Sequence, residues 1–312
     1  MDRWTKSSTR PACMRWGFPA THPWKKASAA PSSGSGRPAR KEPSGSSLKT
    51  CLVIGARGFI GSAIAAEAAA RGYRLTALDV DNYAKHRGTN ADLLINAAGN
   101  SRKYIDDQDP VRGYDLSVTS VMNVLHDFHF TRFVQLSSGA VYPNEGDPHR
   151  NAEDTPLTPA GMSRYGFHKW LAEQLVLHYA PHHLILRLGG FVGPRLVKNA
   201  VCDLLSGNPL HVHPDSEFQF MDTRDLARAV FELCERSPVP ASPLNLSSRG
   251  TASVRQIAEW AGVNLPPDAF QRPLVRAELN VGQAARLLPL PDTSQTLRTF
   301  IQEVRTGALP LP

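Results

Sequence analysis

Short apolar runs alternate along this chain with longer segments whose apolar residues recur every three or four positions. Five of these runs are expected to form buried strands: Cys51–Ile54, Leu75–Leu78, Leu93–Ala97, Phe133–Leu136 and Leu184–Leu188. Helical spacing follows the first run as far as Arg71, and it recurs at Asp109–Phe128 and Arg164–Tyr179. This alternation is typical of an α/β protein with a doubly wound parallel sheet covered by helices on both faces. A ligand would then lie at the carboxyl ends of the strands.

Three glycines, Gly55, Gly58 and Gly61, close the first strand and open the helix after it. The first permits a tight turn, the second lets the backbone approach a pyrophosphate, and the third allows close packing of helix on strand. Unpaired N–H groups at the start of such a helix favour phosphate. Asp79 ends the next strand, where a carboxylate can accept hydrogen bonds from the adenine ribose. The pattern predicts a Rossmann-type dinucleotide site; a glycine turn that only packs a helix is the alternative.

The expected cofactor is NAD, because the Asp79 carboxylate would repel a phosphate on the adenine ribose. NADP is not excluded, since the guanidinium of Arg57 inside the glycine turn could pair with that phosphate. The residues expected to contact the cofactor lie in the turn, at the second strand and at the end of the third: Gly55, Arg57, Gly58, Phe59, Ile60, Gly61, Asp79, Ala97, Ala98 and Gly99.

The connection between the second and third strands is short. Twelve residues separate Asp79 from Asp92, where a doubly wound sheet usually places a further strand and two helices. One crossover needs about 10–12 residues, so a single connection fits and an extra strand does not. We therefore expect a Rossmann fold that lacks the usual third strand. Its strands should run in the order second, first, third, fourth, fifth, leaving the adenine end of the cofactor cleft open.

The formal net charge of +7 is concentrated near the N-terminus. Residues 1–49 hold ten Lys or Arg and two acidic residues, which leaves 25 basic and 26 acidic residues for the rest. Nucleic-acid binding needs basic residues clustered on a folded face, so it is not expected. Residues 1–48 are rich in Ser, Pro and Gly, which predicts a disordered basic tail. A transit peptide, or translation from too early a start codon, is the alternative that the sequence leaves open.

Other features point away from membranes, metals and disulfides. The chain has no run of 18 apolar residues. Its four cysteines are scattered, and its histidine pairs lack the carboxylate spacing of a metal motif. We expect a cytoplasmic protein with reduced thiols that acts on a small-molecule substrate, without a membrane, metal or nucleic-acid partner. A homodimer is left open.

Two further segments complete a recognisable pattern. A strand-end segment, Phe133–Tyr142, contains Ser137 and Ser138, and Tyr165 and Lys169 lie four positions apart at the start of a helix. They share one helical face, so the ammonium can lie beside the phenol and lower its pKa toward the working pH. With the glycine turn, these segments resemble the extended short-chain dehydrogenase/reductase family, the NAD-dependent epimerase/dehydratase group.

The resemblance covers about residues 49–261 and implies a catalytic set of Ser138, Tyr165 and Lys169. Tyr165 would exchange a proton with a substrate hydroxyl or carbonyl while hydride moves to or from the nicotinamide. Ser138 would hydrogen-bond the reacting oxygen, and Lys169 would also hold the nicotinamide ribose. The expected activity is that of an NAD(P)-dependent oxidoreductase or epimerase acting on a secondary alcohol or ketone of a sugar, nucleotide sugar or sugar-like metabolite. A catalytically idle NAD(P)-binding sensor or scaffold is the alternative.

Several positions depart from the family pattern. Gly139 and Ala140 replace the Asp-Glu pair of its dehydratases, which excludes dehydration by that route. Gly190 and Phe218 replace an asparagine and an arginine that commonly hold a nucleotide diphosphate. Other cations that could take over this contact are Arg195, Lys198 and Arg249.

The chain is expected to divide into three parts. After the tail at residues 1–48 come a dinucleotide-binding domain at residues 49–190 and a small, mainly substrate-binding lobe at residues 191–312. Helices expected in the lobe are Asn199–Ser206, Thr223–Cys234 and Ser253–Trp260. Residues 266–312 are weakly patterned.

Overall fold

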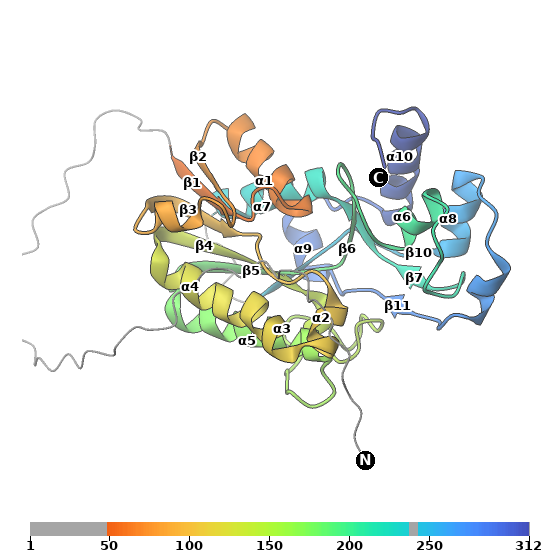
Figure 1. Ribbon diagram of the computed structural model, residues 1–312, viewed down its shortest axis with the longest axis horizontal. Helices are drawn as coiled ribbons and strands as arrows, with labels where there is room; N and C mark the ends of the chain where they lie inside the picture. The colour runs from red at the N-terminus through yellow and green to blue at the C-terminus, as the bar shows by residue number, and fades with distance from the viewer. Residues whose placement is uncertain (1–48, 237–242, 312) are drawn as a thin grey trace, which may run out of the picture. The chain divides into compact units, whose positions relative to one another are not determined.

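The computed structural model describes residues 49–236 and 243–311, which belong to one compact unit. The predicted tail at residues 1–48 lies outside the described residues. Six strands form a parallel sheet in the order β2-β1-β3-β4-β5-β9 (Figure 1). Their bounds are β1 Thr50–Ile54, β2 Arg74–Leu78, β3 Asn90–Asn96, β4 His129–Ser138, β5 His183–Leu188 and β9 Leu244–Leu246.

The first five strands follow the predicted order, and β9 extends the sheet beside β5. Between β2 and β3, all of whose linking residues are described, the chain forms one 3-10 helix, η1 (Tyr83–His86). The predicted lack of the usual third strand is therefore confirmed. β2 is the edge strand on this side of the sheet.

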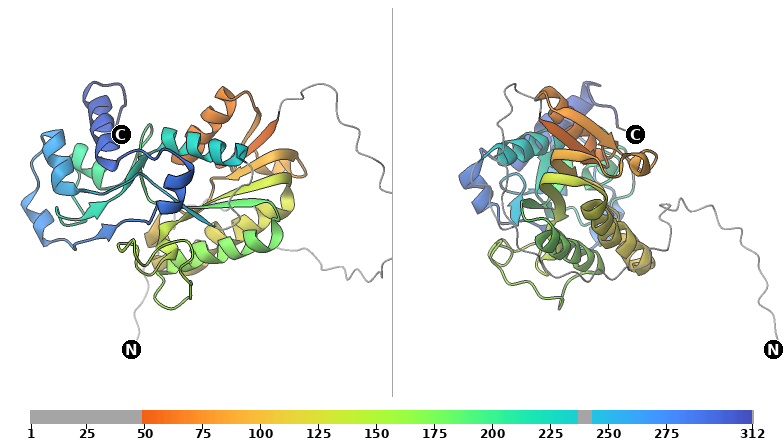
Figure 2. Two further views of the ribbon diagram at one scale, coloured as in Figure 1. Left: turned by 180° about the vertical axis from the view of Figure 1, so that it is seen from behind. Right: turned by 90° about the vertical axis from the view of Figure 1, so that its left-hand side faces the viewer.

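Helices cover both faces of the sheet (Figures 1 and 2). On one face lie α1 (Phe59–Ala70), α7 (Thr223–Glu235) and α9 (Gly282–Leu287), and on the other lie α4 (Ser120–Asp127) and α5 (Arg164–Tyr179). Ile64 and Ala68, four positions apart on α1, are fully buried in the same cluster as Val53 of β1. Removal of this apolar surface from water holds the helix against the strand that precedes the glycine turn.

The helix predicted over Asp109–Phe128 is interrupted. It begins as α3 (Pro110–Tyr114), continues as a π-helical turn at Asp115–Thr119 and ends as α4. Asp109 caps α3, its carboxylate accepting the Arg112 N–H at 3.1 Å. A short helix, α2 (Lys103–Gln108), precedes it. Periodicity of apolar residues reports a helix but does not distinguish a π turn within it.

A second hydrophobic cluster is built from residues of the predicted lobe. Around it lie a two-stranded sheet, a three-stranded sheet and three helices. These elements are β6 Gly190–Val192, β8 Phe220–Asp222, β10 Ala252–Ser253, β7 Glu217–Phe218, β11 Arg276–Ala277, α6 Ala200–Leu205, α8 Val254–Ala261 and α10 Thr293–Arg305. The three predicted lobe helices are α6, α7 and α8, whereas α10 falls in the weakly patterned segment. Because α7, β9 and α9 return to the main sheet, the chain crosses the boundary predicted at residue 190 several times, and that boundary stays a prediction.

Three cysteines are free and buried: Cys51 on β1, Cys202 on α6 and Cys234 on α7. Burial raises the pKa of the Cys51 and Cys234 thiols to about 12. Among residues 49–236 and 243–311, no helix has both the length and the apolar character needed to cross a membrane.

Candidate active site

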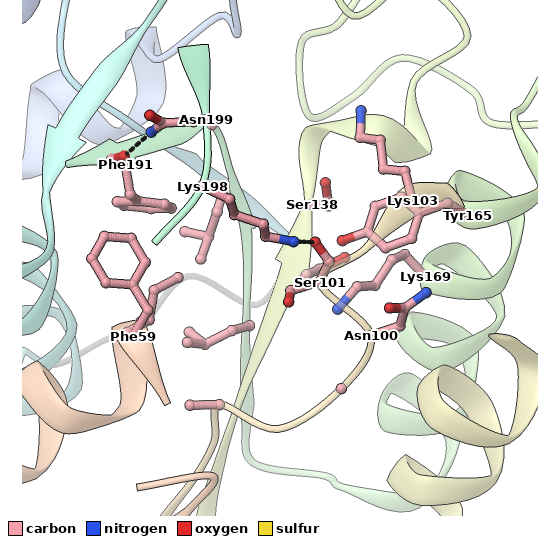
Figure 3. Close-up of a pocket in the computed structure, with 18 of the residues that line it drawn as sticks. Phe59, Asn100, Ser101, Lys103, Ser138, Tyr165, Lys169, Phe191, Lys198 and Asn199 are labelled. Atoms are coloured by element: carbon pink, nitrogen blue, oxygen red, sulfur yellow. Dashed lines mark hydrogen bonds between the residues drawn. The ribbon is translucent and has the colours of Figure 1, made fainter. Parts of the chain in front are cut away.

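A cavity of about 500 Å³ lies at the carboxyl ends of β3, β4 and β5 and at the start of α1. All three residues of the predicted catalytic set, Ser138, Tyr165 and Lys169, line it (Figure 3). Of the predicted cofactor residues, Phe59, Ile60, Ala97, Ala98 and Gly99 line the same cavity. The others are not among its lining residues: Gly55, Arg57, Gly58 and Gly61 lie in the turn between β1 and α1 and at the start of α1, and Asp79 follows β2.

The position of Tyr165 follows from a close approach of α5 to the end of β4. Ser163 caps the helix by accepting the Gly166 N–H at 3.1 Å. A Cβ atom on Gly166 would lie 1.9 Å from the Ala140 carbonyl oxygen, so the helix can approach this closely only with glycine there. The approach brings the Tyr165 phenol to the same cavity as Ser138.

The electrostatics of this pair differ from the sequence-based expectation. Burial raises the pKa of the Tyr165 phenol, while the nearby Ser138 side chain lowers it and the charge of Asp106 raises it further. The Lys169 ammonium lies 5.8 Å from the centroid of the Tyr165 ring. Burial lowers the pKa of Lys169 to about 8, against the opposing effect of Asp106 and Glu173. The expected lowering of the phenol pKa is therefore not found, because desolvation dominates over the nearby ammonium.

A buried ion pair fixes α5 to the two strands beneath the site. Arg187 on β5 contacts Glu173 on α5 with both ends of its guanidinium, at 2.7 Å from Nη2 and 3.1 Å from Nε. The same carboxylate accepts a hydrogen bond of 2.5 Å from Ser137, the residue before Ser138. Bidentate pairs of this kind constrain orientation as well as distance. They hold the helix that carries Tyr165 in register with the strand that carries Ser138.

A second buried network was not predicted. Asp106 on α2 is fully buried and lies 2.6 Å from Nδ1 of His168, the residue before Lys169. Its other oxygen accepts a hydrogen bond from Asn100, which lines the cavity. Asp106 thus ties the loop after β3 to the helix that carries Tyr165 and Lys169. These residues are distant in sequence and carry no periodic signal, so the pattern of the chain did not reveal them.

The glycine turn has the geometry of a dinucleotide cradle. Gly55 has a φ of +78°, and a Cβ atom on Gly61 would lie 2.0 Å from the Gly55 carbonyl oxygen. No side chain in the described part of the chain caps the start of α1 at Gly58, which leaves the N-terminal N–H groups available to an anion. These residues fit the diphosphate of a dinucleotide. The N–H groups at the uncapped start of α1 can bind its oxygens, and the glycines, which have no side chain, let it approach the backbone closely.

Arg57 and Asp79 contact each other at the adenine end. The Asp79 carboxylate accepts the Arg57 backbone N–H at 3.0 Å and lies 3.1 Å from Arg57 Nε. The Arg57 guanidinium also pairs with Asp81 at 2.5 Å. These contacts hold the Arg57 side chain beside two carboxylates rather than leaving it unpaired.

The opposite wall comes from residues beyond β5 and is largely aromatic. Phe191, Phe218 and Phe220 line it, together with Lys198 and Asn199. Asn199 caps α6, and its side-chain N–H donates to the Phe191 carbonyl at 2.8 Å. Lys198 reaches across the cavity and donates to the carbonyl of Ser101 (Figure 3). Lys198 was predicted from the sequence as a candidate cation, whereas Asn100, Ser101, Lys103 and Asn199 were not predicted to line the site. The first three lie within four residues after Gly99, so a longer predicted segment at the end of the third strand would have included them.

Comparisons with known proteins agree with this geometry. Solved structures with a similar fold include MoeE5 in complex with UDP-glucuronic acid and NAD, with 20% identity and a TM-score of 0.67 over 83% of this chain and 99% of that one. The UDP-glucose 4-epimerase of Thermotoga maritima with UDP-glucose has 18% identity and a TM-score of 0.67 over 83% and 99%. The dTDP-4-dehydrorhamnose reductase of Bacillus anthracis str. Ames with NADP has 17% identity and a TM-score of 0.67 over 83% and 100%.

Comparison of the sequence with curated proteins gave no match. The model of one protein family, described as the NAD dependent epimerase/dehydratase family, matches residues 51–245. The match begins in β1 and ends in β9, so it spans the glycine turn, the end of β4 and the Tyr165–Lys169 helix start. Its extent confirms the resemblance inferred from the sequence and the enzyme class that it implied. The chain belongs to the NAD dependent epimerase/dehydratase family.

Proposed function

We propose that this protein catalyses NAD(P)-dependent oxidation–reduction or epimerisation at a secondary alcohol or ketone of a sugar or nucleotide sugar. The observation that carries the proposal is the convergence of Ser138, Tyr165 and Lys169 on one cavity, which the start of α1 also lines. The solved structures cited above, which are complexes with UDP-glucuronic acid and NAD, with NADP and with UDP-glucose, support the substrate class and the cofactor. The Ser-Tyr-Lys chemistry and the specific reaction are part of the proposal.

The cofactor would lie with its diphosphate over the glycine turn and its nicotinamide ribose beside Lys169. When bound, it supplies or accepts the hydride. Phe59 and Ile60 line the cavity at the start of α1, and Ala97, Ala98 and Gly99 line it at the end of β3. These short side chains after β3 leave room for the ribose. A Cβ atom on Gly99 would lie 3.4 Å from Lys169 Nζ, so a side chain there would crowd the ammonium.

Tyr165 is the proposed proton donor. Because burial raises the pKa of its phenol, the hydroxyl is protonated at neutral pH and can donate to a substrate carbonyl oxygen. Ser138 would hold that oxygen through a second hydrogen bond. In the reverse direction, Tyr165 must first lose its proton, which the positive charge of Lys169 favours. Burial of the phenol therefore assists ketone reduction more than alcohol oxidation.

Replacement of Tyr165 by Phe tests this mechanism, because it removes one hydroxyl and keeps the ring. We expect turnover to fall roughly a hundredfold to ten-thousandfold, the usual contribution of a positioned acid or base. Affinity for NADH, measured by fluorescence titration, should change less than about twofold. Nucleotide sugars and free sugars would be screened with the wild-type protein to obtain the activity.

Tyr179→Phe is the matched control, since Tyr179 lies at the other end of α5, is exposed and does not line the cavity. If Tyr165→Phe keeps more than about a tenth of wild-type turnover, Tyr165 is not the acid. A protein that binds NADH and turns over none of the sugars screened would instead support the sensor or scaffold alternative.

A further inference from the structure

Two lysine ammonium groups flank the phenol ring of Tyr165. The ammonium of Lys169 and that of Lys103 each lie 5.8 Å from the centroid of this ring. Figure 3 shows the two side chains on opposite sides of Tyr165, Lys169 from α5 and Lys103 from the start of α2. Both lysines line the cavity, but only Lys169 belongs to the predicted catalytic set. Lys103 thus approaches the proposed proton donor from an element outside the motif that predicted it.

Lys103 forms an ion pair with Glu145, which lies in the segment between β4 and α5. Both carboxylate oxygens of Glu145 lie 3.1 Å from the Lys103 ammonium. The Lys103 side chain is 57% exposed and that of Glu145 is 33% exposed. Ion pairs with this exposure contribute little to stability, because water and salt screen both charges. The place of this pair beside Tyr165 therefore matters more than its contribution to the fold.

The two partners of this ion pair act on the Tyr165 phenol with opposite signs. A positive charge beside a phenol favours its ionised form, and a negative charge disfavours it. Burial raises the pKa of Tyr165, and the charge of Glu145 raises it further. Because Lys103 carries the opposite charge and lies over the ring, it offsets the effect of Glu145. The other groups that face the phenol are Lys169 on α5, Asp106 on α2 and Ser138 on β4.

We propose that Lys103 is a second positioning lysine for Tyr165, which promotes ionisation of the phenol, and that Glu145 limits this effect by pairing with it. The inference rests on the proposed function, because ionisation of Tyr165 matters only if this residue exchanges a proton. Alcohol oxidation needs the ionised phenol, and ketone reduction needs the protonated one. A lysine whose charge is partly offset by a carboxylate favours the ionised form less than an unpaired one, so the pair keeps both directions accessible.

The opposite signs of the two partners provide the test. A fluorinated tyrosine, whose phenol is more acidic than that of tyrosine, would be placed at position 165 of the full-length protein. Fluorine NMR would follow its ionisation as the pH rises at low ionic strength. We expect Lys103→Met to raise the titration midpoint by about half a pH unit and Glu145→Gln to lower it by a similar amount. The double replacement should return the midpoint to within about 0.2 pH units of the protein that has both partners.

Lys85→Met is the matched control, because Lys85 is exposed, does not line the cavity and its replacement removes the same charge. It should leave the midpoint within about 0.2 pH units. A purely structural ion pair predicts shifts in the same direction for both single replacements, since each breaks the same contact. Shifts in the same direction, or no shift from Lys103→Met, would overturn the inference. The titration uses no substrate, so its outcome is separate from that of the Tyr165→Phe experiment, which tests the proposed function.

Discussion

Lys169, which is proposed to act as a charged group, is buried in surroundings that disfavour its charged form. The residue is 7% exposed, and burial lowers the pKa of its ammonium from 10.5 to about 8. Between pH 8 and 10.5, Lys169 therefore keeps its proton in the unfolded chain but loses it in the folded one. Below pH 8 the lysine is charged in both states and the full cost of burial applies, whereas the cost disappears as the pH rises through 8 to 10.5.

Lys169→Met should consequently stabilise the fold at pH 7 while it removes activity. We expect a gain of roughly 1–3 kcal/mol in the free energy of unfolding at pH 7, shrinking toward zero near pH 10.5. Denaturant titrations across this pH range would measure it. The exposed Lys85→Met change should give no comparable trend, and a Lys169→Met protein less stable than wild type at pH 7 would show that the ammonium is held by favourable contacts.

We expect Arg57 and Asp79 to decide the preference between NAD and NADP. Asp79 accepts the Arg57 N–H at 3.0 Å, which directs its carboxylate to the place where the adenine ribose is expected. We predict that NADH binds more tightly than NADPH, because a ribose phosphate would meet the carboxylates of Asp79 and Asp81. Asp79→Ser combined with Asp81→Asn should reverse the order, because Arg57 pairs with both carboxylates and their joint removal frees it to pair with the phosphate. Fluorescence titrations of both cofactors decide this, and a wild-type preference for NADPH would give Arg57 the controlling role.

Among the elements, the turn between β1 and α1 has a strict requirement for glycine. A Cβ atom on Gly61 would overlap the backbone of Gly55, which cannot move without separating α1 from β1. Gly61→Ala should therefore lower stability by roughly 1–3 kcal/mol or more and abolish NADH binding. Thermal melts and NADH titrations would measure both effects.

Gly72→Ala provides the comparison for this prediction. Gly72 has a φ of +76°, and a Cβ atom there would meet nothing within 4 Å. The change tests backbone strain alone, so it should cost about 1 kcal/mol and spare NADH binding. Equal effects of the two changes on NADH affinity would argue that the turn does not cradle the cofactor.

The elements also show how far the sequence could be interpreted. Five strands and their order were predictable, because each buried parallel strand is a short apolar run and the gap after Asp79 limits the topology. The site was predictable where local motifs carry it, as at Tyr165 and Lys169. The Asp106–His168 contact was not, since it joins residues 62 positions apart. Nor was the direction of the pKa shift at Tyr165, because it depends on burial rather than on neighbours in sequence.

At the scale of the whole molecule, the residues after β5 build a second hydrophobic cluster while α7, β9 and α9 return to the sheet. The two clusters are thus joined by several crossings of the chain. Cooperative unfolding of residues 49–311 is the natural expectation from this connectivity.

The three buried thiols allow that expectation to be tested through the rate at which each of them reacts with a thiol reagent. Cys51 and Cys234 belong to the sheet cluster, and Cys202 belongs to the second one. A thiol reagent such as Ellman's reagent can reach them only when their surroundings open, so each labelling rate reports the opening of one cluster. With Cys13, which lies outside the described residues, replaced by Ser, we expect all three thiols to react at one common rate. Faster labelling of Cys202 would mean that the second cluster opens while the sheet cluster stays closed. Access to the cavity would then be controlled by the opening of the second cluster.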